Sequence, residues 1–387
     1  MKTELSYVFI TPYSIVKSRT GGIMARLLSR TDLELVGIQM ILPDGEFVRD
    51  YARLIREQAP RDERDFLADF VEKNFISGGR AHRILMLLMR GPDAYNKLNG
   101  ICGHIHPENR GLESLTGETI RDTYSDLIFD SADPGKVTYF EPAVCTPRNQ
   151  EDANRDLELI ARLLKGKQNI VTNMVYPNPA KVEKTLVILK PDNWEHASSK
   201  PGAIIDMFSR TGLRIVGIKI HQFTHEEALE FYAPVESVLK EKLVPDAAER
   251  AVDLLEKEFD IKLSGATKNL LRENFGRDFA ECRFLDIIEF MSGMRPDSAG
   301  TAKHVKTMIL VYEGEEAIRK IREVLGPTDP LKAPEGTVRR EFGSSIMVNT
   351  AHASDSAESF NREQRIVKIY ENTLRDIIEN HLIECRR

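Results

Sequence analysis

The stretch GGIMARLLSRTDLELVGIQM, from Gly21 to Met40, returns in the second half of the chain as PGAIIDMFSRTGLRIVGIKI, from Pro201 to Ile220. The two segments are offset by 180 residues and share identical residues along their whole length. Self-similarity at a fixed spacing is the sequence signature of a repeated structural unit. The identical pairs are Gly22 and Gly202, Ser29 and Ser209, Arg30 and Arg210, Thr31 and Thr211, Val36 and Val216, Gly37 and Gly217, and Ile38 and Ile218.

Two further matches lie on either side of this stretch. Upstream, YVFITP from Tyr7 to Pro12 corresponds to LVILKP from Leu186 to Pro191. Downstream, GETIRD from Gly117 to Asp122 corresponds to EGTVRRE from Glu335 to Glu341. The matches keep their order while the offset grows from 179 to 218 residues, as loop insertions in duplicated domains would produce. Chance similarity of amphipathic helices explains ordered matches with shared Gly and Arg positions less well than duplication does.

The junction between the copies is predicted near YPNPAKVE, from Tyr176 to Glu183, where prolines and an asparagine form a breaker cluster. We therefore expect two domains, residues 1–178 and 181–387. A chain of 387 residues suits two domains of this size.

The composition narrows the class of protein. Sixty acidic and 54 basic residues give a net charge of −6, which argues against nucleic acid or an anionic membrane as the main partner. No apolar run approaches 18 residues, so no membrane span is expected. The start, MKTELSYVFITPY, is not a signal peptide by its pattern. Cys102, Cys145, Cys282 and Cys385 are scattered, which suits reduced thiols and a cytoplasmic location.

The second half predicts alternating strands and helices. Strands are expected at TLVILK from Thr185, LRIVGIKIHQF from Leu213, KTMILVYEG from Lys306 and SSIMVNTAH from Ser344. The resulting order, β-α-β, helices, β-α-β, is the split βαβ or ferredoxin-like arrangement, an α+β fold with a four-stranded antiparallel sheet. The first half reads the same way, and each half carries a helical insert, at about residues 46–89 and 236–281.

The helices between these strands carry recognisable ends. Residues 202–210 show a helical apolar face, and Thr224 with Glu227 forms a capping box that opens a helix at His225. The helix EEAIRKIREVL ends at Gly326, a typical C-cap. Ser354 and Asp355 are expected to cap the helix that follows.

The string NTAHASDS, from Asn349 to Ser356, is the candidate for chemistry, because the chain has no P-loop, paired Rossmann glycines or H-E-x-x-H. We expect its His352 beside a helix N-terminus, a natural place for phosphate; by itself, a histidine there could simply cap or pack in a loop. Lys190, Arg322 and Arg339 are candidate phosphate ligands, although each alone could equally be a solvated surface charge.

Together these residues resemble a known family. KPD at Lys190–Asp192, the SRTGLRIVG block, REVLGPTDP at Arg322–Pro330, PEGTVRREF at Pro334–Phe342 and N-x-x-H-x-S-D-S resemble nucleoside diphosphate kinases. The resemblance spans nearly all of residues 184–370 apart from one insert. It implies that His352 is the nucleophile that takes the γ-phosphoryl group. It also implies a phosphate clamp of Lys190, Arg322 and Arg339 with Thr328, a sugar contact from Asn349, and Tyr232, Ser354 and Glu363 as neighbours of the nucleophile.

The activity implied by this resemblance is exchange of a γ-phosphoryl group between nucleoside tri- and diphosphates through a phosphohistidine, with ping-pong kinetics. The implied cofactor is Mg²⁺, held by the nucleotide phosphates rather than by protein ligands. Assembly as a homo-oligomer, or as a pseudo-dimer within one chain, is also implied. The alternative is a non-catalytic nucleotide-binding regulatory or assembly protein whose long insert blocks or redirects the site. The insert also leaves the base-stacking residue open: Phe279 and Phe284 are candidates, and each could be a core residue instead.

The first copy lacks most of these groups. Lys190 falls on Thr11, Cys145 takes the place of the nucleophile, and no equivalent of Arg322 is evident. Tyr51 and Arg121 match Tyr232 and Arg339. We therefore expect a structural pseudo-domain in the first half. A C-x-H-x-H string at Cys102, His104 and His106 could suggest a metal on one face of a strand, but without a fourth ligand a loop or core role is favoured.

Overall fold

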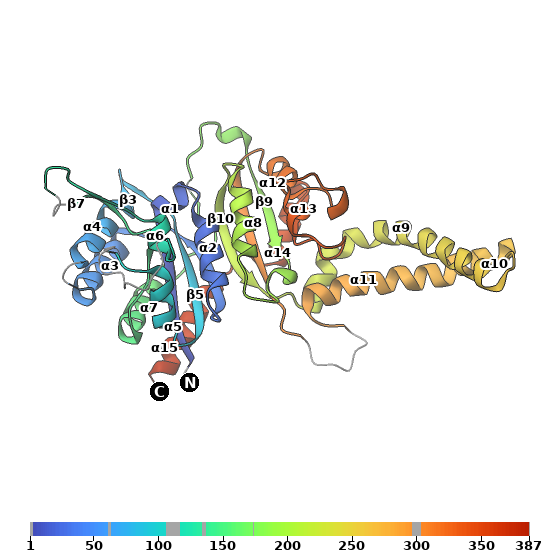
Figure 1. Cartoon of the computed structure of the whole chain (residues 1–387), viewed down its shortest axis with the longest axis horizontal. Helices are drawn as coiled ribbons and strands as arrows, with labels where there is room; N and C mark the ends of the chain where they lie inside the picture. Colours follow the sequence, from blue (N-terminus) through green and yellow to red (C-terminus); the bar gives the residue numbers. More distant parts are fainter. Residues whose placement is uncertain are drawn as a thin grey trace. The chain divides into compact units, whose positions relative to one another are not determined.

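The computed structural model describes residues 3–60, 63–105, 117–133, 137–172, 174–295 and 303–386. It contains two four-stranded antiparallel sheets with strand orders β2-β5-β1-β8 and β10-β11-β9-β12. The two orders are the same when each strand is matched to its partner in the other half. The predicted α+β, ferredoxin-like fold, used twice, is therefore confirmed (Figure 1).

The first sheet consists of β1 (Thr3–Ile10), β2 (Glu34–Ile41), β5 (Ile84–Pro92) and β8 (Val144–Cys145). Its helices are α1 (Pro12–Val16), α2 (Thr20–Ser29), α3 (Gly45–Gln58), α4 (Arg64–Asn74), α5 (Ala94–Cys102), α6 (Ile120–Tyr124) and α7 (Gln150–Leu164). Two small hairpins accompany it, β3 (Ile76–Ser77) with β4 (Arg80–Ala81), and β6 (Asp126–Phe129) with β7 (Val137–Glu141).

The second sheet consists of β9 (Val182–Leu189), β10 (Arg214–His221), β11 (Thr307–Glu315) and β12 (Ala351–Ala353). The helices in the second half of the chain are α8 (Lys200–Ser209), α9 (His225–Phe259), α10 (Gly265–Leu270), α11 (Arg277–Ser292), α12 (Ala317–Leu325), α13 (Val338–Phe342), α14 (Ala357–Ile366) and α15 (Thr373–Cys385). Short helical turns are η2 (Pro179–Lys181), η3 (Pro191–Asn193), η5 (Pro330–Lys332) and a π-helical segment η4 (Leu271–Gly276). The capping box of Thr224 and Glu227 and the C-cap at Gly326 are as predicted.

Part of the predicted first insert is a strand. Residues 84–89, which we expect within a helical insert over 46–89, belong to β5, while α3 and α4 supply the helices. The segment ILMLLM is apolar throughout, and periodicity cannot assign such a run to a helix or a strand. β5 pairs with both β1 and β2, which covers both of its edges, and residues 84–89 are all 0% exposed, so both of its faces are covered as well.

The chain forms two compact units that differ from the two sequence copies. One unit contains both sheets, and the other comprises His221–Thr307 with Arg365–Val367. In the second unit α9 and α11 pack against each other as a helical hairpin, which contains the insert predicted at about residues 236–281 and extends beyond it at both ends (Figure 1). The sequence boundary at 178 and 181 stays a prediction.

Equivalent glycines bring the two copies together within the first unit. Helices α2 and α8 cross at Gly21 and Gly202, and a Cβ atom on Gly21 would lie only 2.6 Å from the carbonyl oxygen of Gly202. No side chain fits at either position, so the two helix backbones can approach closely only because both residues are glycine.

The C-terminal segment of each copy contacts the other copy. The Val171 N–H donates to Val216 O in β10 at 2.7 Å, so the linker extends along the edge of the second sheet. In the opposite direction, α15 contacts α7 and β2 of the first copy. Its Leu374, Ile378 and Leu382 belong to the hydrophobic core of the first copy. The two copies therefore share core residues.

Candidate active site

His352 lies in the middle of the short strand β12, opposite Ile188 of β9. Its Nε2 atom is 2.9 Å from Oε1 of Glu363, which projects from α14. The other oxygen of Glu363 accepts a hydrogen bond of 2.6 Å from the Ser354 hydroxyl. Glu363 is only 2% exposed and the His352 side chain is 24% exposed, so a buried, fully bonded carboxylate orients a partly accessible imidazole.

Three expectations about the surroundings of His352 are wrong. The predicted strand over residues 344–352 is reduced to Ala351–Ala353, because the preceding residues fold into a turn. Helix α14 begins only at Ala357, so His352 belongs to the strand and not to the helix N-terminus. Ser356, not Ser354 or Asp355, caps that helix by accepting the Ser359 N–H at 3.0 Å. Ser354 is engaged with Glu363 instead.

Lys190 and Asn349 form a buried pair at the end of β9. Lys190 Nζ donates to Asn349 Oδ1 at 2.7 Å and to Met347 O at 3.3 Å. Burial, with a smaller contribution from Arg339, lowers the pKa of Lys190 to about 7, and Asp192 opposes the shift. The amide of Asn349 in turn donates to Thr328 O at 3.1 Å. Lys190, Asn349 and Thr328, which are far apart in the sequence, are therefore brought together.

The two predicted clamp arginines differ in their surroundings. Arg339 in α13 is half-buried and donates to Gly326 O and to Ala351 O, both at 3.0 Å. It is thereby bound to the residue that precedes His352. Arg322 in α12 is exposed, and its charge helps to hold the pKa of Asp355 below its usual range, after the larger effect of the Ser359 hydrogen bond.

The remaining predicted residues lie in the helical hairpin. Tyr232 is buried in α9 beside Phe231, with ring centroids 5.2 Å apart. Phe284 is buried in α11, and the Phe279 ring contacts Phe275 and Arg283. All of these residues belong to the second compact unit, so their roles at the site stay predictions.

The first copy places Cys145 where the second has His352. Cys145 is opposite Phe9 in β1, and Phe9 corresponds to Ile188 by the 179-residue offset. Arg121 donates to Gly103 O and to Val144 O, the same two backbone positions that Arg339 uses. No equivalent of Arg322 is evident in the sequence of the first copy, but the structure places Asn99 at that position. Asn99 precedes the C-cap Gly103 by four residues, as Arg322 precedes the C-cap Gly326.

The first copy also retains a carboxylate that the sequence analysis missed. Asp156 follows Cys145 by eleven residues, the spacing between His352 and Glu363. The Tyr7 hydroxyl donates to Asp156 at 2.8 Å and lies 3.1 Å from the Tyr51 hydroxyl. Burial raises the pKa of Cys145 to about 12. The equivalent position is therefore packed with aromatic rings around an inert thiol.

Within the described ranges, no group of three or more His, Cys, Asp or Glu residues could hold a metal ion. Cys102 ends helix α5 and is buried, so it does not lie on a strand, the arrangement that the disfavoured metal-site alternative required. His106 lies outside the described residues. Among the same residues, no helix has the length and apolar character needed to cross a membrane.

A carboxylate-bound histidine, a buried lysine and an arginine on an α+β sheet together suit a protein that handles phosphate groups. A sequence model of the nucleoside diphosphate kinase family matches residues 183–242 and 259–370. The nucleoside diphosphate kinase of Staphylothermus marinus is 32% identical over 185 residues, which are 48% of this chain and 92% of the relative. Nucleoside diphosphate kinase 2 of Protochlamydia amoebophila is 32% identical over 182 residues, 47% of this chain and 88% of the relative.

A solved structure of the Aquifex aeolicus nucleoside diphosphate kinase is 30% identical and covers 48% of this chain and 94% of its own, with a TM-score of 0.30. The sequence relatives are matched over nearly their whole length at this identity. The chain therefore belongs to the nucleoside diphosphate kinase family.

Proposed function

We propose that the chain transfers the γ-phosphoryl group of a nucleoside triphosphate to a nucleoside diphosphate, with His352 as the transient carrier. The contact between His352 Nε2 and the buried Glu363 carries this proposal. A carboxylate at Nε2 favours the tautomer with its proton there, which places the lone pair on Nδ1. A protein that only bound nucleotides would need no such oriented nucleophile.

In the first half-reaction, Nδ1 attacks the γ-phosphorus, the new P–N bond forms, and the bond to the β,γ-bridging oxygen breaks. The nucleoside diphosphate leaves with both electrons of that bond. In the second half-reaction, a terminal oxygen of another diphosphate attacks the same phosphorus and the P–N bond breaks. Glu363 accepts the Nε2 hydrogen bond in both steps and stabilises the positive charge on the phosphorylated ring.

Lys190, Arg322 and Arg339 supply the positive field that phosphoryl transfer requires, with Thr328 as a further donor and Asn349 toward the sugar. Tyr232 is proposed to lie beside the nucleophile. The carboxylates at the site are already engaged, Glu363 with His352 and Ser354, and Asp192 with Lys200. Mg²⁺ is therefore proposed to enter on the nucleotide phosphates, where it neutralises their charge.

The first domain, residues 1–178, is proposed to act as a scaffold for the second, residues 181–387. Its Cys145 is buried with a raised pKa, and Thr11 stands in place of the lysine. The shared core with α15 gives the first domain a structural task that needs no catalysis of its own.

The proposal is tested by incubating the purified chain with γ-labelled ATP and Mg²⁺. We expect one label per chain that is stable in alkali, lost in acid, and released as a labelled triphosphate when GDP is added. A wild-type chain that stays unlabelled under these conditions would instead support the non-catalytic nucleotide-binding alternative.

Nucleotide binding is expected to take up a proton through Lys190. The empty site holds the pKa of Lys190 at about 7, so at pH 8 the amine is mostly neutral. A bound phosphate anion favours the ammonium and raises that pKa. ADP affinity should therefore fall as the pH rises above 7, by up to about tenfold per pH unit. Calorimetry at pH 8 in buffers of different ionisation enthalpy measures the uptake, and Lys190→Met should remove it; equal uptake in the variant would contradict this assignment.

A further inference from the structure

We propose that Asp192, Lys200 and Thr350 form a positioning lock that holds the turn before His352 and, through it, the Lys190–Asn349 pair. This inference rests on the proposed function, because it assigns to the lock an effect on phosphorylation of His352. None of the three residues is placed in the phosphate clamp or in the His352 contacts.

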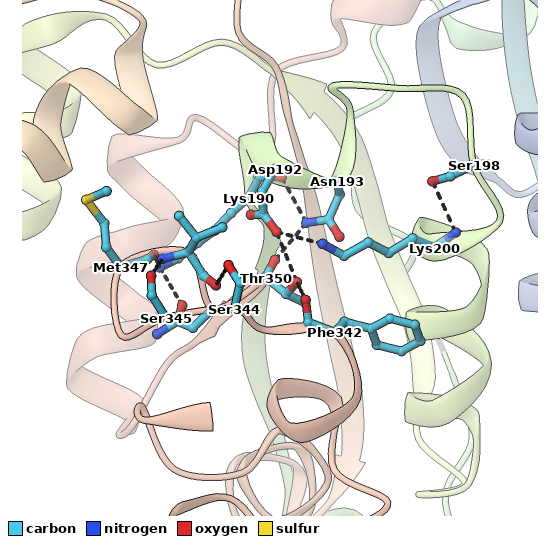
Figure 2. A network of polar contacts seen from close by, with 12 residues as sticks. Lys190, Asp192, Asn193, Ser198, Lys200, Phe342, Ser344, Ser345, Met347 and Thr350 are labelled. Atoms are coloured by element: carbon cyan, nitrogen blue, oxygen red, sulfur yellow. Dashed lines mark hydrogen bonds and ion pairs between the residues drawn. The ribbon is translucent and has the colours of Figure 1, made fainter. Parts of the chain in front are cut away.

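The lock is a chain of short polar contacts between distant segments. Lys200 Nζ, at the start of α8, lies 2.7 Å from Asp192 Oδ2. The same oxygen lies 3.0 Å from the Thr350 hydroxyl. Figure 2 draws Lys200, Asp192 and Thr350 side by side. The Asp192 side chain is only 5% exposed. Its carboxylate is therefore held in one place by Lys200 and offers Thr350 a fixed acceptor.

Thr350 needs such an anchor because of its backbone. Its φ is +72°, in the left-handed region that a β-branched residue rarely adopts. It lies directly between Asn349 and the strand that carries His352. Any relaxation of this turn would move the residues on both sides of it, and displacements of about 1 Å are enough to slow an aligned reaction greatly.

The turn is also bonded directly to the lysine. The Lys190 N–H donates to Thr350 O at 3.0 Å. The Asn193 amide bridges the two residues, donating to Lys190 O at 2.9 Å and to Thr350 O at 2.8 Å. Asp192 lies between Lys190 and Asn193 in the sequence, so side chain and backbone of this one turn fix Thr350 together.

The first copy contains the equivalent turn but lacks the lock residues. Ala143, the counterpart of Thr350, has a φ of +61°, so the strained turn belongs to the fold. Tyr13 and Thr20 replace Asp192 and Lys200 there, and the Ala143 N–H is held by Glu141 instead. The turn can thus form without an Asp–Lys–Thr chain, and that chain occurs in the copy that keeps the histidine.

The test follows from the single proton of the Thr350 hydroxyl. This hydroxyl also lies 3.1 Å from Phe342 O, so loss of Asp192 leaves it a second acceptor. Thr350→Val removes the hydroxyl, and with it the contacts to both acceptors, at nearly constant volume. Thr350→Ser keeps the hydroxyl. Asp192→Asn and Lys200→Met weaken only the carboxylate side of the lock.

The measurement is the single-turnover rate of His352 phosphorylation at saturating γ-labelled ATP. We expect roughly a tenfold to hundredfold loss in Thr350→Val, near wild-type rates in Thr350→Ser, and a smaller loss in Asp192→Asn and Lys200→Met. Thermal unfolding midpoints are recorded for each variant, and Asp192→Asn carries the test if Thr350→Val does not fold.

Equal rates in Thr350→Val and the wild type would overturn the lock, as would equal losses in the valine and serine variants. Both results leave the proposed function standing, because the wild type is labelled. A wild type that is never labelled removes the proposed function itself, so the two failures are distinct.

Discussion

Replacing His352 with alanine is expected to abolish phosphoryl transfer, lowering the rate at least about a thousandfold. The reaction proceeds through a bond from the imidazole to phosphorus, and the other group bonded to Glu363, the Ser354 hydroxyl, is 0% exposed. The clamp and Asn349 stay in place in this variant, so ADP should still bind. The measurements are the coupled nucleoside diphosphate kinase assay and acid-labile labelling from γ-labelled ATP.

The matched control is Cys145→Ser at the equivalent position of the first copy. The Cys145 thiol is buried, and burial raises its pKa to about 12, so it is protonated near neutral pH. Activity should stay within about twofold of the wild type, because thiols react as thiolates. Label that persists in His352→Ala and disappears in Cys145→Ser would reverse the assignment of the active copy.

Much of the second site could be predicted because its signals are local. The resemblance to nucleoside diphosphate kinases implies Glu363, eleven residues after His352, as a neighbour of the nucleophile, and the structure places these side chains 2.9 Å apart. The capping box at Thr224 involves only neighbouring residues, so a short window was sufficient to find it.

Other features depend on contacts that no local pattern contains. The apolar run of β5 became a strand only through pairing with β1 and β2. His352 does not lie at the predicted helix N-terminus, because Ser356 caps the helix and the helix therefore begins further along the chain. Asp156 could have been found from the same eleven-residue spacing as Glu363. Its hydrogen bond with Tyr7, 149 residues away in the sequence, could not.

Because the two copies share core residues, a substitution in α15 is expected to lower the stability of the first copy. Ile378 in α15 is 0% exposed and lies in the core that α15 shares with the first copy. Ile378→Ala should lower the free energy of unfolding by roughly 2–5 kcal/mol, since it leaves a cavity in a closely packed core. Urea unfolding followed by circular dichroism measures the change.

The same helix offers a matched control in Ile383, which is 51% exposed. Ile383→Ala should change stability by no more than about 0.5 kcal/mol. Because α15 follows α14, which carries Glu363, the urea concentration that halves His352 labelling should shift with the unfolding midpoint in Ile378→Ala. Loss of first-copy structure without loss of labelling would show that the second copy works alone, and the scaffold role of the first would then be wrong.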